Sequence, residues 1–107
     1  MASIETESNR VILHDGGTTL TLDKAAGQAT LQRKVLLWNK KPVVFPLTEI
    51  DDIAVKSEKD AMSGATLWHS VMHRRSGETT VLTTERAEDA EATVEKLRSF
   101  IGLHQDL

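Results

Sequence analysis

The 107-residue sequence has no cysteine, only two prolines, and two tryptophans and two phenylalanines as its only aromatic residues. Without cysteine there can be no disulfide, thiolate zinc site, iron–sulfur ligation or cysteine nucleophile. So few aromatic side chains leave no stacking platform of the kind that nucleic-acid binders use. No apolar run approaches the roughly 18 residues that span a bilayer. These absences disfavour a nucleic-acid-binding or membrane-spanning function.

The charge balance is slightly acidic, with 13 Lys and Arg against 16 Asp and Glu and a net charge of −3. We therefore expect no long-range attraction to anionic lipid or nucleic acid. The length supports one domain. Residues 1–9 carry Ser, Thr, Asn and two Glu with a single Ile and resemble a disordered tail, so we place the domain at residues 10–104. The first residues lack the basic and apolar regions of a secretory signal, and we expect a cytoplasmic protein.

Short runs rich in Val, Leu, Ile and Thr, separated by turn signals, predict antiparallel hairpins from Arg10 to residue 84. In these runs apolar residues alternate with polar ones, as in half-buried strands. Arg33 interrupts one such apolar face, which indicates a bulge or an exposed strand end. A second irregularity is expected around Asp51-Asp52, where the apolar spacing changes from three to two. We expect six or seven strands.

The last segment changes to helical periodicity. Its apolar residues recur every three or four positions, at Ala87, Ala90, Val94, Leu97 and Ile101. Thr83 or Thr84 is the expected N-cap, and Gly102 is the expected end of the helix. The predicted class is therefore mainly β (α+β), with one amphipathic C-terminal helix.

This order of elements, together with four short motifs, resembles the bacterial pleckstrin-homology-like (PH-like) domains. The motifs span most of residues 11–103 and read Leu20-Thr21-Leu22-Asp23, Gln28-Ala29-Thr30-Leu31, Phe45-Pro46-Leu47-Thr48-Glu49-Ile50-Asp51-Asp52-Ile53 and Leu97-Arg98-Ser99-Phe100-Ile101-Gly102-Leu103. The resemblance implies a barrel of two roughly orthogonal antiparallel sheets closed by the C-terminal helix. It implies no catalytic residue and no single ligand.

Two groups of side chains could carry chemistry, and both have a simpler interpretation. His69 and His73 would lie on one face of a helix, but on a strand they are roughly 13 Å apart, too far for one metal ion. Adjacent Asp51 and Asp52 point to opposite faces of a strand, so a solvated turn is the better interpretation. We expect no enzymatic activity, no metal and no cofactor.

The resemblance also suggests basic residues around one hairpin as ligands for an anionic lipid headgroup. The comparable residues here are Lys24, Arg33 and Lys34. The spacing departs from the usual pattern, because Arg33 and Lys34 are adjacent and face opposite sides of a strand. Only one of them can face a ligand.

Trp38, Trp68 and Phe100 are the candidates for a protein interface. Each tryptophan adjoins a polar residue, and Phe100 lies off the main helical stripe. The leading hypothesis is a non-enzymatic module for protein recognition, including homo-oligomerisation, through a sheet edge, the helix and these side chains. The alternative is peripheral attachment to membranes through the basic residues.

Overall fold

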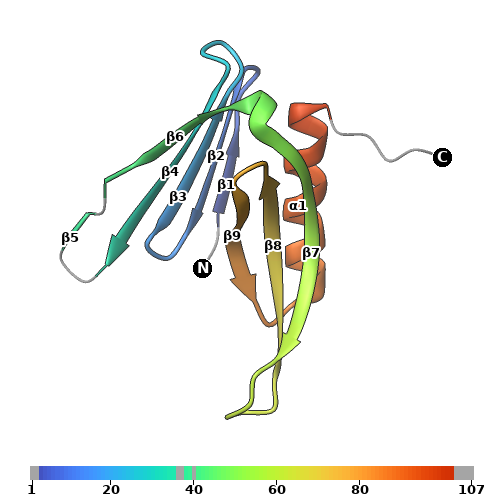
Figure 1. Ribbon diagram of the computed structural model, residues 1–107. Coiled ribbons are helices and arrows are strands. Elements are labelled where there is room, and N and C mark those ends of the chain that lie inside the picture. Colours follow the sequence, from blue (N-terminus) through green and yellow to red (C-terminus); the bar gives the residue numbers. More distant parts are fainter. Residues whose placement is uncertain (1–2, 36–37, 40, 103–107) are drawn as a thin grey trace. The chain divides into compact units, whose positions relative to one another are not determined.

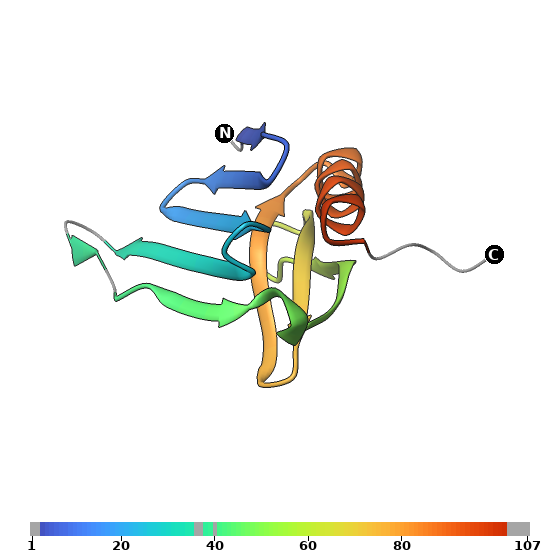
Figure 2. The same cartoon turned by 90° about the horizontal axis from the view of Figure 1, so that it is seen from above.

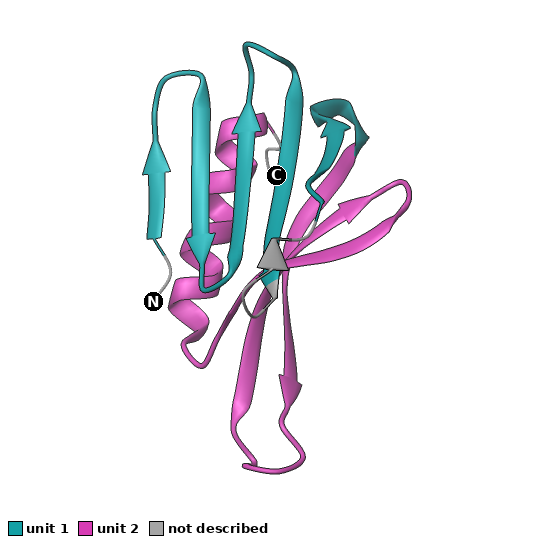
Figure 3. Ribbon diagram, turned by 90° about the vertical axis from the view of Figure 1, so that its left-hand side faces the viewer, with its two compact units in different colours: residues 1–49 teal, residues 50–107 magenta. Residues whose placement is uncertain are grey.

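The computed structural model describes residues 3–35, 38–39 and 41–102. The chain divides into two compact units, residues 1–49 and residues 50–107, which Figure 3 shows in different colours. Unit 1 holds a six-stranded sheet followed by a short 3-10 helix, and unit 2 holds a three-stranded sheet followed by the α-helix. The boundary falls where η1 ends and the long strand β7 begins.

Unit 1 is an antiparallel sheet in which β1 to β4 lie side by side in chain order (Figure 2). Strand β4 pairs in succession with β5 and β6, which share its other edge. The elements are β1 (Ser3–Thr6), β2 (Arg10–Asp15), β3 (Thr18–Asp23), β4 (Gln28–Val35), β5 (Trp38–Asn39), β6 (Val43–Pro46) and η1 (Leu47–Glu49).

One face of this sheet is apolar, as the alternation in the sequence predicted. Its buried side chains are Val11, Leu13, Leu20, Leu22, Ala29, Leu31 and Phe45. The ladder between β3 and β4 stays in register up to Arg33, whose side chain is exposed. The interruption at Arg33 is therefore an exposed strand end and not a bulge.

The disordered tail expected for residues 1–9 is wrong for Ser3–Thr6. These residues form β1, which pairs antiparallel with β2 through four residue pairs. Local composition predicted a tail because Ile4 is the only apolar side chain in the segment. The pairing instead depends on the backbone of β2, whose edge supplies hydrogen-bond partners that no local pattern shows.

Unit 2 is a meander of three strands covered by the C-terminal helix (Figure 1). The register between β7 and β8 shifts between Ile50 and Asp52, which confirms the irregularity expected there. A second shift lies between β8 and β9. The elements are β7 (Ile50–Lys59), β8 (Thr66–Arg74), β9 (Gly77–Thr84) and α1 (Ala87–Ile101).

Helix α1 packs on all three strands of unit 2 and is seen nearly end-on in Figure 2. Its buried side chains are Ala90, Val94, Leu97 and Phe100. Ser70 is the one polar residue among the described positions that is classed as buried, and its hydroxyl donates to the carbonyl of Ala90 at 3.0 Å. This bond gives a buried hydroxyl the partner it needs and ties β8 to the helix.

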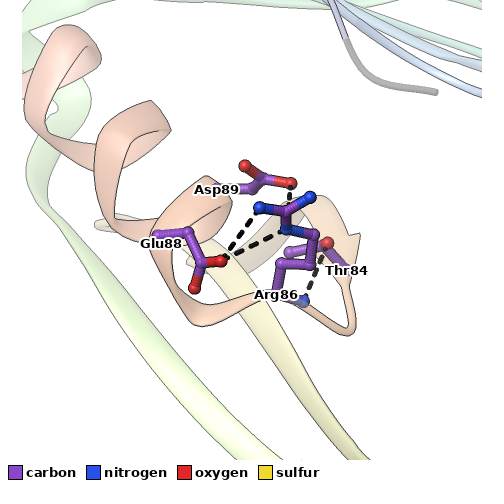
Figure 4. Close-up of polar contacts among 4 residues, drawn as sticks. All are labelled: Thr84, Arg86, Glu88 and Asp89. Carbon is purple, nitrogen blue, oxygen red and sulfur yellow. Dashed lines mark hydrogen bonds and ion pairs between the residues drawn. The ribbon is translucent and has the colours of Figure 1, made fainter.

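The start of the helix differs from the expected threonine cap. The N-cap residue is Arg86, and its side chain makes no capping bond to the helix backbone. Thr84 lies two residues before this N-cap position, and its hydroxyl accepts instead from the backbone N–H of Arg86 at 3.1 Å. The Arg86 guanidinium lies beside the carboxylates of Glu88 and Asp89, at 3.1 and 3.7 Å (Figure 4). At the other end, Gly102 adopts the left-handed conformation expected of a C-cap.

The fold class is mainly β with one C-terminal helix, as predicted from the sequence. The part of the chain that the structure describes forms nine strands where six or seven were expected. The extra strands are β1, in the expected tail, and β5, a two-residue strand. Hydrogen-bonded ladders among the described residues stay within each sheet and close no barrel. None of the described helices is long and apolar enough to cross a membrane.

Candidate binding surfaces

The basic residues proposed for headgroup binding do not form one cluster. Lys24 lies in the turn between β3 and β4, beyond the pair of Asp23 and Gln28. Arg33 lies at the other end of the same ladder, opposite Thr18. Five residues of strand separate the two ends, roughly 17 Å. This separation disfavours a single headgroup held by both Lys24 and Arg33.

Arg33 and Lys34 remain at one end of the sheet, next to the turn between β2 and β3. Both side chains are exposed, and their adjacent positions point them to opposite faces of β4. The backbone N–H of Lys34 donates to the carbonyl of Gly17 at 2.8 Å, which fixes this end of the strand. A ligand on either face meets one of these two cations.

The three aromatic interface candidates have different outcomes. Phe100 is 9% exposed and belongs to the buried side of α1, so it does not present a surface to a partner. A helical stripe wider than about 100° includes such flank positions, which explains why the sequence pattern left it out. Trp68 is half-buried on β8 and stays a candidate. The side chain of Trp38 lies outside the described residues.

One face of the sheet in unit 2 carries a chain of polar contacts. The His69 ring lies between the Thr83 hydroxyl, at 2.9 Å from Nδ1, and the Glu58 carboxylate, at 2.8 Å from Nε2. His73 lies four residues further along β8, with its Nδ1 3.3 Å from Oε1 of Glu78. Each histidine has its own carboxylate, and the described residues form no group of three or more metal-ligating side chains.

Glu78 is the centre of the second half of this chain of contacts. Lys56 Nζ donates to both of its carboxylate oxygens at 2.7 Å. The hydrogen bond from Lys56 lowers the pKa of Glu78 below its ordinary value of 4.5, and the positive charges of Lys56 and His73 act in the same direction. A group with a lowered pKa stabilises the folded state above its unfolded pKa, and this contribution is lost as the pH falls through the folded value.

We expect replacement of Lys56 by methionine to raise the pKa of Glu78. The variant keeps the aliphatic stem and removes both the hydrogen-bond donor and the positive charge. An NMR titration of the Glu78 side-chain carboxyl carbon measures the shift. Lys59→Met, which removes an exposed lysine at the end of the same strand, should leave the Glu78 pKa unchanged. Equal shifts in both variants would contradict a specific contact with Lys56.

Asp52 is held by the helix and is not a free carboxylate beside Asp51. The guanidinium of Arg98 donates to Asp52 and, at 3.1 Å, to the carbonyl of Ile53. The side chain of Asp51 is exposed. The solvated turn expected for this pair is therefore wrong, because both residues lie in β7 and Asp52 is half-buried against Arg98.

The loop between β7 and β8 presents one large apolar side chain. Met62 is 96% exposed at its tip. The Asp60 carboxylate accepts from the Ser63 hydroxyl at 2.7 Å and from the Met62 backbone at 3.3 Å, and these bonds lower the pKa of Asp60. The tip is therefore an ordered turn. One exposed methionine offers little binding area, so it is not a docking surface by itself.

Strand edges are a further way for this fold to bind a partner. Along β6 the exposed side chains of Val43 and Val44 suggest such an edge. The Leu47 N–H donates to the Gly27 carbonyl at 3.0 Å, in register with the ladder between β4 and β6. Bonded pairs alternate along an antiparallel ladder, so Phe45 is a bonded position, like Leu47. Val44 and Pro46 lie at the alternate positions and direct their backbone groups away from β4.

The prolines weaken that edge. Pro46 has no N–H to donate. Pro42, just before β6, is two residues from Val44 and therefore lies on the same outward-facing side of the strand. Val44 alone thus offers an outward N–H between the two prolines. Proline on an edge strand is a known protection against pairing with another chain. The exposed valines therefore do not make β6 a strong edge for strand addition.

The outer edge of β1 has no proline to protect it. The Glu7 N–H donates to the Arg10 carbonyl at 2.7 Å, in register with the ladder between β1 and β2. Glu5 and Ser3 are consequently the bonded positions, and Ile4 and Thr6 direct their N–H and C=O groups away from β2. Neither is proline, and β1 pairs with no second strand in the described part of the chain.

Comparison with known proteins gives no family assignment. No family model matches the chain, and no curated protein and no solved structure matches it. Sequence reasoning missed the β1 edge, because a four-residue strand with one apolar side chain has almost no periodic signal.

Proposed function

We propose that this chain is a PH-like, non-enzymatic binding module whose function is protein recognition, including homo-oligomerisation. The observation that carries protein recognition is the outer edge of β1, where Ile4 and Thr6 each direct an N–H and a C=O away from β2. An extended segment binds such an edge by adding a strand, with its main chain giving affinity and its side chains giving specificity.

The PH-like assignment is supported by the order of the elements. Two antiparallel sheets are followed by one helix that packs on the second sheet, and the residue motifs quoted above fall in the same order along the chain. The non-enzymatic assignment is supported by the polar contacts on unit 2, where each histidine has a separate carboxylate partner and the pairs do not converge on one point. Convergent titratable groups in a pocket are what catalysis requires.

Attachment to membranes is the weaker proposal. The separation of Lys24 from Arg33 removes the arrangement that favoured it, and the net charge of −3 opposes attraction to anionic lipid. Arg33 and Lys34 still supply two exposed cations at one end of unit 1. A contact made by these residues would weaken steeply with salt, whereas an interface of main-chain bonds and apolar side chains would not.

Vesicle flotation combined with light scattering distinguishes the two functions. We expect no flotation on neutral or anionic vesicles at low or high salt, and we expect the scattering mass of the full chain to exceed 11.8 kDa as its concentration rises. Flotation on anionic vesicles that is lost at high salt and in Arg33→Glu would favour the membrane function. A monomer at all concentrations would remove homo-oligomerisation from the proposal.

A further inference from the structure

The strand edges of unit 2 are protected in a way that the β1 edge is not. The bond from Asp60 N–H to the Ala65 carbonyl, at 2.8 Å, is in register with the ladder between β7 and β8. The carbonyl of Ile53 therefore faces away from β8. Arg98 already donates to it, and charged side chains at Lys56, Glu58 and Lys59 line the rest of β7. Lysines and other charges on an edge strand oppose addition of another strand.

A β-bulge interrupts the outer edge of β9. The register between β8 and β9 shifts between Ser70 and Val71, so that β9 carries one extra residue near Val81. Such a bulge breaks the regular spacing of the outward N–H and C=O groups. Together with the prolines beside β6, these features leave β1 as the regular, proline-free edge among the described strands longer than the two residues of β5.

The side chains of β1 define what can bind there. Ile4 is half-buried and pairs with buried Leu13, so its neighbour on an added strand lies on the apolar side of the sheet. Glu5 points to the other side and is exposed. Its carboxylate makes no ion pair with another described residue, whereas the nearby Glu7 is bonded to Arg10 at 2.9 Å. An added strand therefore meets an unneutralised negative charge opposite its central residue.

This charge argues against a second copy of β1 as the occupant. In an antiparallel pair of β1 strands, outward residues must pair with outward residues. The one register that uses both Ile4 and Thr6 of each copy matches Ile4 with Thr6 and places Glu5 opposite Glu5. Like charges directly opposite each other are destabilising. A strand with a basic residue at that position replaces the repulsion by attraction.

We infer that the outer edge of β1 docks an extended segment of another protein that has a basic residue opposite Glu5 and β-branched apolar residues on either side of it. The inference rests on the proposed function and names its partner class. The main chain of the segment bonds to Ile4 and Thr6, and its basic side chain pairs with Glu5. Homo-oligomerisation, where it occurs, then uses a different surface.

The test is an NMR titration of the full ¹⁵N-labelled chain with two blocked pentapeptides, TVKVT and TVEVT. With TVKVT, we expect saturable shifts of the Ile4 and Thr6 amide signals. With TVEVT, we expect binding weaker by about fivefold, the scale of one cross-strand charge pair. Glu5→Lys should reverse the preference between the two peptides.

Two proline variants provide matched controls. Ile4→Pro removes an outward N–H and leaves the bonds of Glu5 and Ser3 to β2 in place, so binding should be lost while the Glu5 amide stays protected from exchange. Val44→Pro makes the same change on the outward side of β6 and should leave binding unchanged. Absence of saturable shifts at Ile4 and Thr6, equal binding of both peptides, or full binding by Ile4→Pro would overturn the inference. Any of these results, with light scattering still showing an oligomer, would overturn the inference about β1 and leave homo-oligomerisation, the other part of the proposed function, standing.

Discussion

Replacement of Leu97 by alanine should lower the free energy of unfolding by about 2 to 5 kcal/mol. Leu97 is completely buried on the side of α1 that packs on the sheet of unit 2. The variant loses the transfer free energy of the removed atoms and leaves a cavity that the neighbouring side chains fill only in part. Urea denaturation followed by circular dichroism measures the change as a lower midpoint at constant slope.

Lys96→Ala is the matched control for this prediction. Lys96 is the preceding residue of the helix, its side chain is exposed, and alanine is a good helix former. We expect its effect on stability to lie within about 0.5 kcal/mol. A loss below about 1 kcal/mol for Leu97→Ala would mean that this side of the helix does not hold unit 2 together.

Replacement of Gly17 by alanine should cost about 1 to 3 kcal/mol, the usual cost of forcing extra atoms into an occupied space. A Cβ atom at this position would lie 2.7 Å from the backbone carbonyl oxygen of Lys34. The obstacle is main chain and not a flexible side chain, so the turn or the end of β4 must move. The same denaturation measurement gives the loss.

Gly16→Asn is the companion variant, because the two glycines are adjacent in one turn and differ in their surroundings. Gly16 has a φ of 57°, and a Cβ there would meet no atom within 4 Å. Asparagine tolerates this left-handed conformation better than most residues, so the cost should be at most about 1 kcal/mol. If Gly17→Ala proved no more costly than Gly16→Asn, the close approach to Lys34 would have no energetic consequence.

The strands and the helix followed from the sequence wherever many residues repeat one pattern. Leu20 and Leu22 alternate with threonines, and Ala90, Val94 and Leu97 recur at helical spacing, so burial of one face determined each element. The bulge at Asp51-Asp52 was visible for the same reason, as a break in the spacing. The N-cap was predicted incorrectly because the capping preference of threonine pointed to Thr83 or Thr84, whereas the backbone begins the helix after Arg86, whose side chain makes no capping bond.

The candidate binding surfaces were less accessible to sequence reasoning. Because Arg33 and Lys34 are adjacent, the sequence already implied that their side chains point to opposite faces of the strand. The distance between Lys24 and Arg33 depends instead on where the hairpin of β3 and β4 turns. Phe100 was selected for lying off the helical stripe, and its burial depends on how far the packed elements reach around the helix. The partners of His69 and His73 lie on β7 and β9, so the chain of polar contacts exists only once three strands are in register.

By itself, the sequence determined the class of the protein: the mainly β composition, the apolar faces, the C-terminal helix and the absence of any cysteine chemistry. These properties depend on residue type and on short-range periodicity, and both can be read directly from the order of the residues. Only the tertiary structure decided which edges of the sheets are open. That property depends on the alternation of backbone hydrogen bonds between strands, which places Pro46 outward on β6 and Ile4 and Thr6 outward on β1. Backbone groups are the same in every residue except proline, so their direction leaves no trace in the sequence until the strands have paired.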